Sequence, residues 1–334
     1  MKFQAIVFVL GALCVGSGFG AVIADDFAEN PTGKGWRAFG ETSLFRWNGS
    51  NQNLEVAWDS SRSNGFFYLP VGTILSKNDD FSVAFDVRLK DVRLGATANK
   101  TNTFEIAIGF LNSRTVTNAN YFRGAGQNAT YGVRNLVEFD YFPDSGFGAT
   151  FATTVVSTNN RILPVHNFPL EMTPGDLFRI TLAYTSSNKT LRTSARKNGT
   201  PFGLSPGNTL GDLVLTSHPD FRVDAFGVSS YSDAIQTSTP DYWGSILAHG
   251  VIDNVVLTVP EAPLPAIAFA ISNSIPQFAF MSRTNWNYSL QRSLDAIQWD
   301  DVSLTVAGNG GSMILTDSNA LAGHMLYRVR LERP

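Results

Sequence analysis

Cysteine is nearly absent from this sequence of 334 residues, and its single instance, Cys14, lies in an apolar segment near the start. A chain with one cysteine cannot close an internal disulfide. Beyond Cys14 the chain also lacks thiolate metal sites and cysteine nucleophiles. The fold must therefore be held by burial of apolar surface, with bound ions as a further means where acidic groups gather.

Charged residues are also scarce, at 16% of the chain, and the formal net charge is −3. Loss of Lys2 with a leader segment would leave 24 basic against 28 acidic residues, a net charge of −4. Nucleic acids and anionic membranes are bound by basic surfaces, so we exclude both as partners. The four histidines do not stand at the spacing of a metal-binding pair.

Long apolar runs are missing as well, because the stretch Ala5–Val15 is too short to span a bilayer. It follows a minimal basic start, and the small residues before Asp25 suit a cleavage site. We therefore predict a signal peptide over residues 1–24, with cleavage after Gly20 as the alternative. The mature chain is expected to be secreted or displayed on the cell surface of a Gram-negative bacterium, with no membrane insertion.

Helical periodicity is absent over any stretch of a dozen residues, whereas apolar and polar residues alternate in several segments. This alternation is typical of half-buried strands, and it is found over residues 81–89, 104–110, 178–184 and 251–259. Glycine, asparagine, proline and serine turns separate the segments, and Asn198-Gly199 is a strong hairpin signal. The pattern predicts an all-β fold, a jelly-roll sandwich, over residues 25–260.

A proline-rich linker is predicted at residues 261–266, and a small C-terminal β module over 267–334. The segments that carry a resemblance in this module are Tyr288-Ser-Leu-Gln-Arg-Ser293, Trp299-Asp-Asp-Val302 and Tyr327-Arg-Val-Arg330. They resemble small β modules at the C-termini of exported proteins of Planctomycetes and Verrucomicrobia. The resemblance implies export; a spacer or stabilising role is the alternative.

The most informative segment is Leu136-Val-Glu-Phe-Asp-Tyr-Phe-Pro-Asp-Ser145. In a strand, Glu138 and Asp140 point to one face with α-carbons about 6.5–7 Å apart. Two such carboxylates repel each other unless water, an arginine or a metal ion compensates them. With Asp144 in the following turn, the oxygen ligands suit Ca²⁺ or Mn²⁺. The alternative is a solvated strand face with a polar turn.

Part of this segment, Val137-Glu-Phe-Asp-Tyr-Phe142, resembles the metal-binding strand of the legume (L-type) lectins, which have the concanavalin A-like sandwich fold. Three further segments follow in the lectin order: Phe178–Tyr184, Phe221–Ser229 and Ala248–Ile252. The resemblance implies a carbohydrate-binding protein. It also implies calcium ligands at Glu138, Asp140, the Phe142 carbonyl and Asp144, the last at a position where the family usually has asparagine.

Two departures from the lectin pattern limit what the resemblance implies. The family continues with an aspartate and a histidine for a transition metal, but residues 147–160 contain no His, Asp or Glu. A transition metal is therefore doubtful, which leaves a calcium-only site or a metal-free strand. The family also places an aspartate before glycine to hold the sugar; here Glu105 stands nearest that position, without a glycine after it.

Three functions are consistent with these observations. The first is non-catalytic, lectin-like binding of a glycan or polysaccharide, with or without a requirement for calcium. The second is a divergent glycoside hydrolase or lyase of the same fold, although Pro143 stands where the hydrolases carry their acid/base. The third is a structural or adhesive envelope protein without a sugar site. A cleft with a second carboxylate facing Glu138 would favour the enzyme, and a shallow aromatic-lined face the lectin.

Overall fold

The computed structural model describes residues 21–98, 100, 105–121, 123, 133–144, 148–204, 207–232, 244–260, 267–282, 286–309, 311–320 and 325–332. The chain separates into two compact units at Pro260, the residue before the predicted linker. We describe each unit by itself. In the part that the structure describes, no helix has the length and apolar character needed to cross a membrane.

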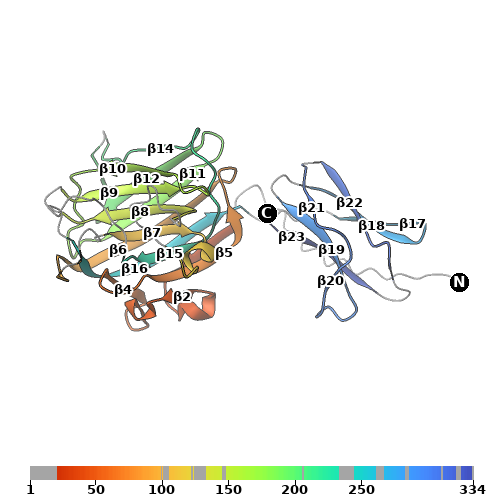
Figure 1. Ribbon diagram of the computed structural model, residues 1–334, viewed down its shortest axis with the longest axis horizontal. Coiled ribbons are helices and arrows are strands. Elements are labelled where there is room, and N and C mark those ends of the chain that lie inside the picture. The colour runs from red at the N-terminus through yellow and green to blue at the C-terminus, as the bar shows by residue number, and fades with distance from the viewer. Residues whose placement is uncertain are drawn as a thin grey trace. The chain divides into compact units, whose positions relative to one another are not determined.

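The first unit contains two antiparallel sheets (Figure 1). The nine-stranded sheet has, in spatial order, β13 (Thr200–Phe202), β12 (Thr190–Lys197), β11 (Phe178–Thr185), β6 (Phe81–Leu94), β16 (Ile246–Val259), β4 (Asn53–Asp59) and β3 (Phe45–Asn48). Two further strands lie beside this order: β1 (Ala21–Asp25) pairs with β16, and β14 (Leu213–Val214) pairs with β12.

The seven-stranded sheet carries the candidate site. Its spatial order is β10 (Ile162–Asn167), β9 (Thr150–Val156), β8 (Leu136–Phe142), β7 (Ile106–Leu111), β15 (Val223–Ser230), β5 (Gly65–Leu75) and β2 (Arg37–Gly40). Strands distant in sequence are thus neighbours, as in a jelly roll, and the predicted all-β sandwich is confirmed. Among the described residues, helical structure is limited to the short elements η1 (Pro31–Lys34), η2 (Thr42–Leu44) and α1 (Ser113–Val116).

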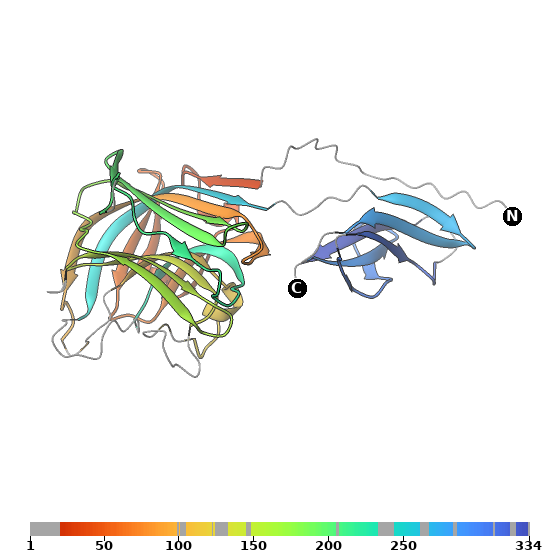
Figure 2. The ribbon, with the colours of Figure 1, turned by 90° about the horizontal axis from the view of Figure 1, so that it is seen from above.

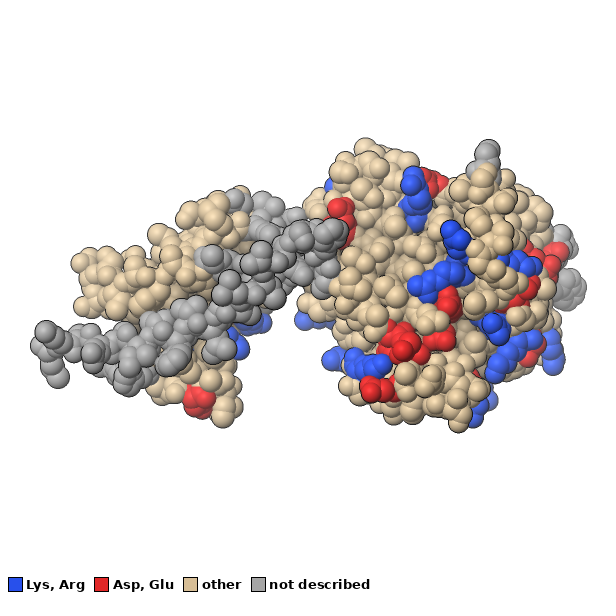
Figure 3. Space-filling model, turned by 180° about the vertical axis from the view of Figure 1, so that it is seen from behind, with Lys and Arg blue, Asp and Glu red and all other residues tan. Residues whose placement is uncertain are grey.

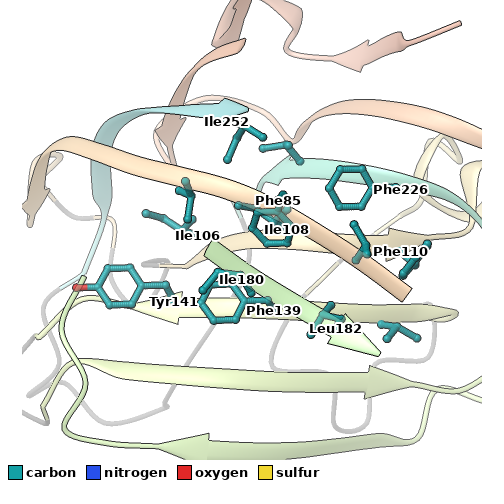
Figure 4. Packing of buried hydrophobic residues seen from close by; sticks show 14 of the residues in the cluster. Phe85, Ile106, Ile108, Phe110, Phe139, Tyr141, Ile180, Leu182, Phe226 and Ile252 are labelled. Carbon is teal, nitrogen blue, oxygen red and sulfur yellow. The ribbon is translucent and has the colours of Figure 1, made fainter. Parts of the chain in front are cut away.

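The main core lies between the two sheets and explains the alternation in the sequence. In β6 the residues at every second position, from Phe81 to Leu89, are buried, and those between them are partly or fully exposed. A strand points successive side chains to opposite faces. Figure 4 shows Phe85 of β6 packed with Phe139 and Phe226, which belong to the other sheet.

The N-terminal strand β1 pairs with the last five residues of β16, with Ala21 opposite Val259 and Asp25 opposite Val255. In Figure 2 it is the red strand beside the end of β16. Asp25 is buried and accepts hydrogen bonds from the Phe27 N–H and the Trp36 indole. The structure therefore builds into the sheet a segment that the sequence prediction assigned to the signal peptide.

The second unit is a small all-β module with its own core. One sheet contains β17 (Ala268–Ser272), β18 (Ile275–Met281) and β22 (Ser312–Thr316). The other contains β20 (Asp300–Asp301), β19 (Asn287–Ser293) and β21 (Val306–Ala307), with β23 (Leu326–Glu332) paired to β19. Buried residues from both sheets form one cluster: Phe278, Phe280, Trp286, Tyr288, Leu290, Met313 and Leu315. The resemblance to bacterial C-terminal modules stays a prediction.

Candidate functional site

Strand β8 is buried on both faces, so its acidic side chains do not lie on a solvated surface. Glu138 is 1% exposed and Asp140 is 0% exposed. Val137, Phe139 and Tyr141 point into the main core between the sheets, and the two carboxylates point to the outer face of the seven-stranded sheet. The alternative of a solvated acidic face is therefore wrong.

A second apolar cluster covers this outer face. It combines strand residues with residues from the segments after β7 and after β15: Phe66, Tyr68, Ala107, Leu111, Val116, Val133, Leu136, Val156, Ala225 and Tyr231. Burial by apolar neighbours removes water from the carboxylates, which raises the free energy of their charged forms. The polar groups here must therefore be compensated by one another.

Small residues on β7 make room for the acidic side chains. Ala107 pairs with Asp140, and Gly109 pairs with Glu138. A Cβ atom built on Gly109 would meet the Val137 carbonyl oxygen at 2.2 Å and the Glu138 Cα at 2.7 Å. Glycine at position 109 therefore permits the close approach of β7 to β8 at the level of Glu138.

Glu105 completes a group of three carboxylates. It lies immediately before β7 and is 2% exposed. Ligand oxygens of Glu105, Glu138 and Asp140 all lie within 4.8 Å of one another. Such a buried acidic triad could hold an ion, and it needs a positive charge, protons or both to be stable at neutral pH.

Arg123 supplies a positive charge inside this group. Its side chain is 5% exposed, and its Nη2 lies 3.1 Å from Glu105 Oε1 and 3.3 Å from Glu138 Oε2. The guanidinium carbon also lies 5.6 Å from the centre of the Tyr231 ring, within the range of a cation–π contact. One arginine thus contacts two of the three carboxylates.

Hydroxyl groups use further carboxylate oxygens. The Tyr231 hydroxyl donates to Glu138 Oε1 at 2.5 Å, and the Thr154 hydroxyl donates to Asp140 Oδ2 at 2.5 Å. Asp140 Oδ1 is buried without a hydrogen-bond partner. We call Glu105, Arg123, Glu138, Asp140, Thr154 and Tyr231 the outer-face cluster.

Burial dominates the electrostatics of this cluster. It raises the pKa of Glu138 to about 7, with Arg123 opposing the rise and Glu105 adding to it. Burial likewise raises the pKa of Asp140 well above its usual range, and the neighbouring glutamates add to the effect. For Arg123 burial acts to lower the pKa, but the attraction of Glu105, Glu138 and Asp140 outweighs it and raises the pKa. The guanidinium therefore stays charged.

The predicted calcium site includes two further residues, Phe142 and Asp144. Phe142 is buried in the main core at the end of β8. Asp144 is exposed, and its Oδ1 accepts a hydrogen bond from the Gly148 N–H. Among the described residues, the third carboxylate of the acidic group is that of Glu105, whereas the sequence prediction named Asp144. The four-ligand calcium site stays a prediction.

A calcium ion does not fit the outer-face cluster as its side chains are arranged. Calcium takes about six to eight oxygen ligands at close range. Here Arg123 contacts Glu105 and Glu138, while Tyr231 and Thr154 bind a further oxygen each on Glu138 and Asp140. Glu138 Oε2 and Asp140 Oδ1 are buried without a hydrogen bond, and Glu138 Oε2 lies 3.3 Å from the Arg123 guanidinium. Entry of a calcium ion would require Arg123 to leave.

Sequence reasoning identified the carboxylates of this cluster but missed three of its members: Arg123, Thr154 and Tyr231. Arg123 and Tyr231 lie in segments between strands, which carry no periodic signal. Thr154 lies on β9, directly opposite Glu138. A strand assignment for residues 150–156 would have placed its hydroxyl on the face of the two acids.

No family model matches this sequence, and no curated protein matches it. Solved structures do: peanut lectin with a nine-residue peptide, at 16% identity and TM-score 0.41, covers 72% of this chain and 99% of that chain. The Lotus tetragonolobus seed lectin has 13% identity and TM-score 0.45, over 72% and 100%. The alginate lyase Aly36B has 12% identity and TM-score 0.41, over 73% and 100%. No residue role is carried over from these proteins.

Proposed function

We propose that this protein is a secreted, non-catalytic carbohydrate-binding protein whose sugar site lies beside the outer-face cluster. The observation that carries the proposal is that charged and aromatic groups lie together on the outer face of the seven-stranded sheet. Phe66, Tyr121 and Tyr231 form an aromatic trio there, with ring centres 5.8–6.5 Å apart. Sugar sites combine aromatic faces with a few fixed polar groups.

Tyr121 is the least buried member of the trio, because it is half-buried whereas Phe66 and Tyr231 are buried. The buried members fix its position by edge and tilted ring contacts. A pyranose ring stacked at Tyr121 would lie at the border of the acidic cluster. An aromatic-lined face is the feature that favours a lectin-like role over an enzyme.

Charge favours a neutral glycan over a polyanionic one. The chain carries a net charge of −3, and one arginine faces three carboxylates in the cluster. Figure 3 shows the first unit from the side of the nine-stranded sheet, where acidic and basic side chains are interspersed among uncharged ones. A uronate polymer would meet three carboxylates and one cation in the outer-face cluster, which disfavours its binding there.

A glycan array with the full chain tests the proposal. We expect binding to neutral polysaccharides, and we expect Tyr121→Ala to weaken it by roughly tenfold, about 1.4 kcal/mol, through loss of the stacking ring. Tyr121→Phe keeps the ring and should keep most of the affinity. Asp212→Asn, at an exposed ion pair on the nine-stranded sheet's side, is the control. Absence of binding to any glycan would favour the structural or adhesive role.

A glycoside hydrolase is a second candidate because Glu105 brings a second carboxylate close to Glu138. Retaining hydrolases use two carboxyl groups about 5–5.5 Å apart, and oxygens of this pair lie within 4.8 Å. Arg123, however, stands against both groups where a scissile bond would have to enter. Release of reducing ends from neutral polysaccharides, lost in Glu138→Gln, would establish the enzyme; binding without release supports the lectin-like role.

A further inference from the structure

Arg123 and the buried carboxylates depend on each other for their stability. The Arg123 side chain, which is 5% exposed, has lost most of its hydration, and so have Glu138 and Asp140. Removing such charges from water is costly unless they are paired at close range. The contacts of Nη2 with Glu105 and Glu138, at 3.1 and 3.3 Å, provide this pairing.

The position of the guanidinium is fixed from a second side by Tyr231. The ring lies 5.6 Å from the guanidinium carbon, and the Tyr231 hydroxyl is bound to Glu138. Tyr231 itself is 2% exposed and packed against Phe66 and Tyr121. An aromatic residue that contacts both the cation and its anion holds the pair in one arrangement.

We infer that Arg123 is the resident cation of the outer-face cluster, and that the cluster therefore takes no divalent metal ion. The inference deepens the proposed function and rests on it in one respect: if glycans bind at this face, their binding does not require a metal ion. It is opposite to the calcium site predicted from the sequence. The positive charge that such a site draws from calcium comes here from the chain itself.

The hydroxyl contacts support this assignment. Tyr231 donates to Glu138 Oε1 and Thr154 donates to Asp140 Oδ2. An incoming metal ion would therefore have to displace these donors from the carboxylates as well as Arg123.

Thermal unfolding of the full chain tests the inference. We expect the same melting temperature in EDTA, in CaCl₂ and in MnCl₂, because no metal binds the folded state. Arg123→Met should lower the melting temperature in EDTA by about 6–20 °C, because it leaves buried carboxylates without their cation. The double variant Arg123→Met with Glu105→Gln should recover part of this loss, because it removes one of the unpaired charges.

Arg179→Met is the matched control, since Arg179 also pairs with a carboxylate, Asp86 at 3.1 Å, but at a half-buried position on the other sheet. It should lower the melting temperature only slightly. If Arg123→Met does not fold, Arg123→Lys takes its place. Lysine keeps a charge without the planar fork, so this variant should fold with an intermediate melting temperature.

Two results would overturn the inference. The first is a saturable rise of the wild-type melting temperature with calcium or manganese. The second is an Arg123 variant as stable in EDTA as the wild type. Neither depends on sugar binding, so failure of the glycan array with an unchanged melting curve would reject the proposed function alone. Glycan binding that is lost in EDTA would reject metal independence while leaving the function in place.

Discussion

Two glutamates beside arginines show how burial sets the properties of single residues. Glu55 lies on the outside of the nine-stranded sheet, where Asn48 and then Arg46 donate to it and lower its pKa to about 2. Glu138 contacts Arg123, yet burial raises its pKa to about 7. The same residue type therefore favours its charged form at one position and resists ionisation at the other.

The raised pKa of Glu138 predicts that acidification stabilises the outer-face cluster. A glutamate ionises at about 4.5 in the unfolded chain and at about 7 in the folded one. Below pH 4.5 both states are protonated; between 4.5 and 7 the unfolded state loses its proton first, so stability falls as the pH rises. The span corresponds to about 3 kcal/mol. Chemical unfolding between pH 5 and 8 measures the trend.

Glu138→Gln is the control for this dependence, because an amide of the same shape does not titrate. The variant should lose the part of the decline between pH 5 and 7 that Glu138 contributes, and Asp140, whose pKa burial also raises, should still contribute its own part. A wild-type stability that is constant over this range would show that Glu138 ionises in the folded chain as easily as in the unfolded one.

Gly109 offers a test of the close approach between β7 and β8. Alanine there would place its Cβ 2.2 Å from the Val137 carbonyl oxygen, so the strands must separate. We expect Gly109→Ala to lower the free energy of unfolding by about 1–3 kcal/mol. Gly33→Ala is the matched control, since nothing lies within 4 Å of its added Cβ. Equal stability of the two variants would contradict the tight contact.

Part of the site could be predicted at the scale of residues. The period of a strand places Glu138 and Asp140 on one face, and they share it with Glu105 of the neighbouring segment. Asp144 could not be assigned in this way, because it lies two residues beyond the end of β8, in a turn where its side chain bonds the Gly148 N–H. Arg123 has no periodic signal at all.

At the scale of elements, alternation identified strands with one buried face and missed those with two. Buried and more exposed residues alternate in strand β6 from Phe81 to Leu89, and the position of this strand was predicted. Strand β9 reads Thr-Phe-Ala-Thr-Thr-Val-Val and is buried at every position. With apolar cover on both sides, burial leaves no pattern of period two to recognise.

Strand β1 predicts where a leader segment can be removed. A chain that begins at Ala21 keeps five pairs with β16, whereas one that begins at Asp25 keeps the pair with Val255 and leaves residues 256–259 of β16 without that partner. We expect the shorter chain to be less stable by roughly 1 to 2 kcal/mol, a fall in melting temperature of about 3–8 °C. Equal melting temperatures would show that β1 contributes nothing to the sheet. If the chain is exported, we expect a mature N-terminus at Ala21, read by N-terminal sequencing.

At the scale of the whole molecule, the composition of Pro260-Glu-Ala-Pro-Leu-Pro265 was the signal for a boundary. Residues on its two sides belong to separate buried clusters, one between the sheets of the first unit and one in the C-terminal module. Proline fixes backbone angles and removes hydrogen-bond donors, which favours an extended connection. The strands within the module were harder to place, because β20 and β21 contain two residues each.

We therefore predict that residues 267–334 fold without the first unit. Their cluster unites β18, β19 and β22 around Phe280 and Tyr288, whose rings lie 5.1 Å apart. Arg292 and Tyr327 add a network by binding Asp317, which is 1% exposed.

Limited proteolysis near residues 260–265 should release this fragment, with dispersed amide resonances in its NMR spectrum. A module of about 70 residues has little stability to spare. Asp317→Ala leaves Arg292 and Tyr327 without their shared carboxylate, so it should unfold the isolated fragment. A released fragment that is unfolded before any substitution would show that the two units stabilise each other.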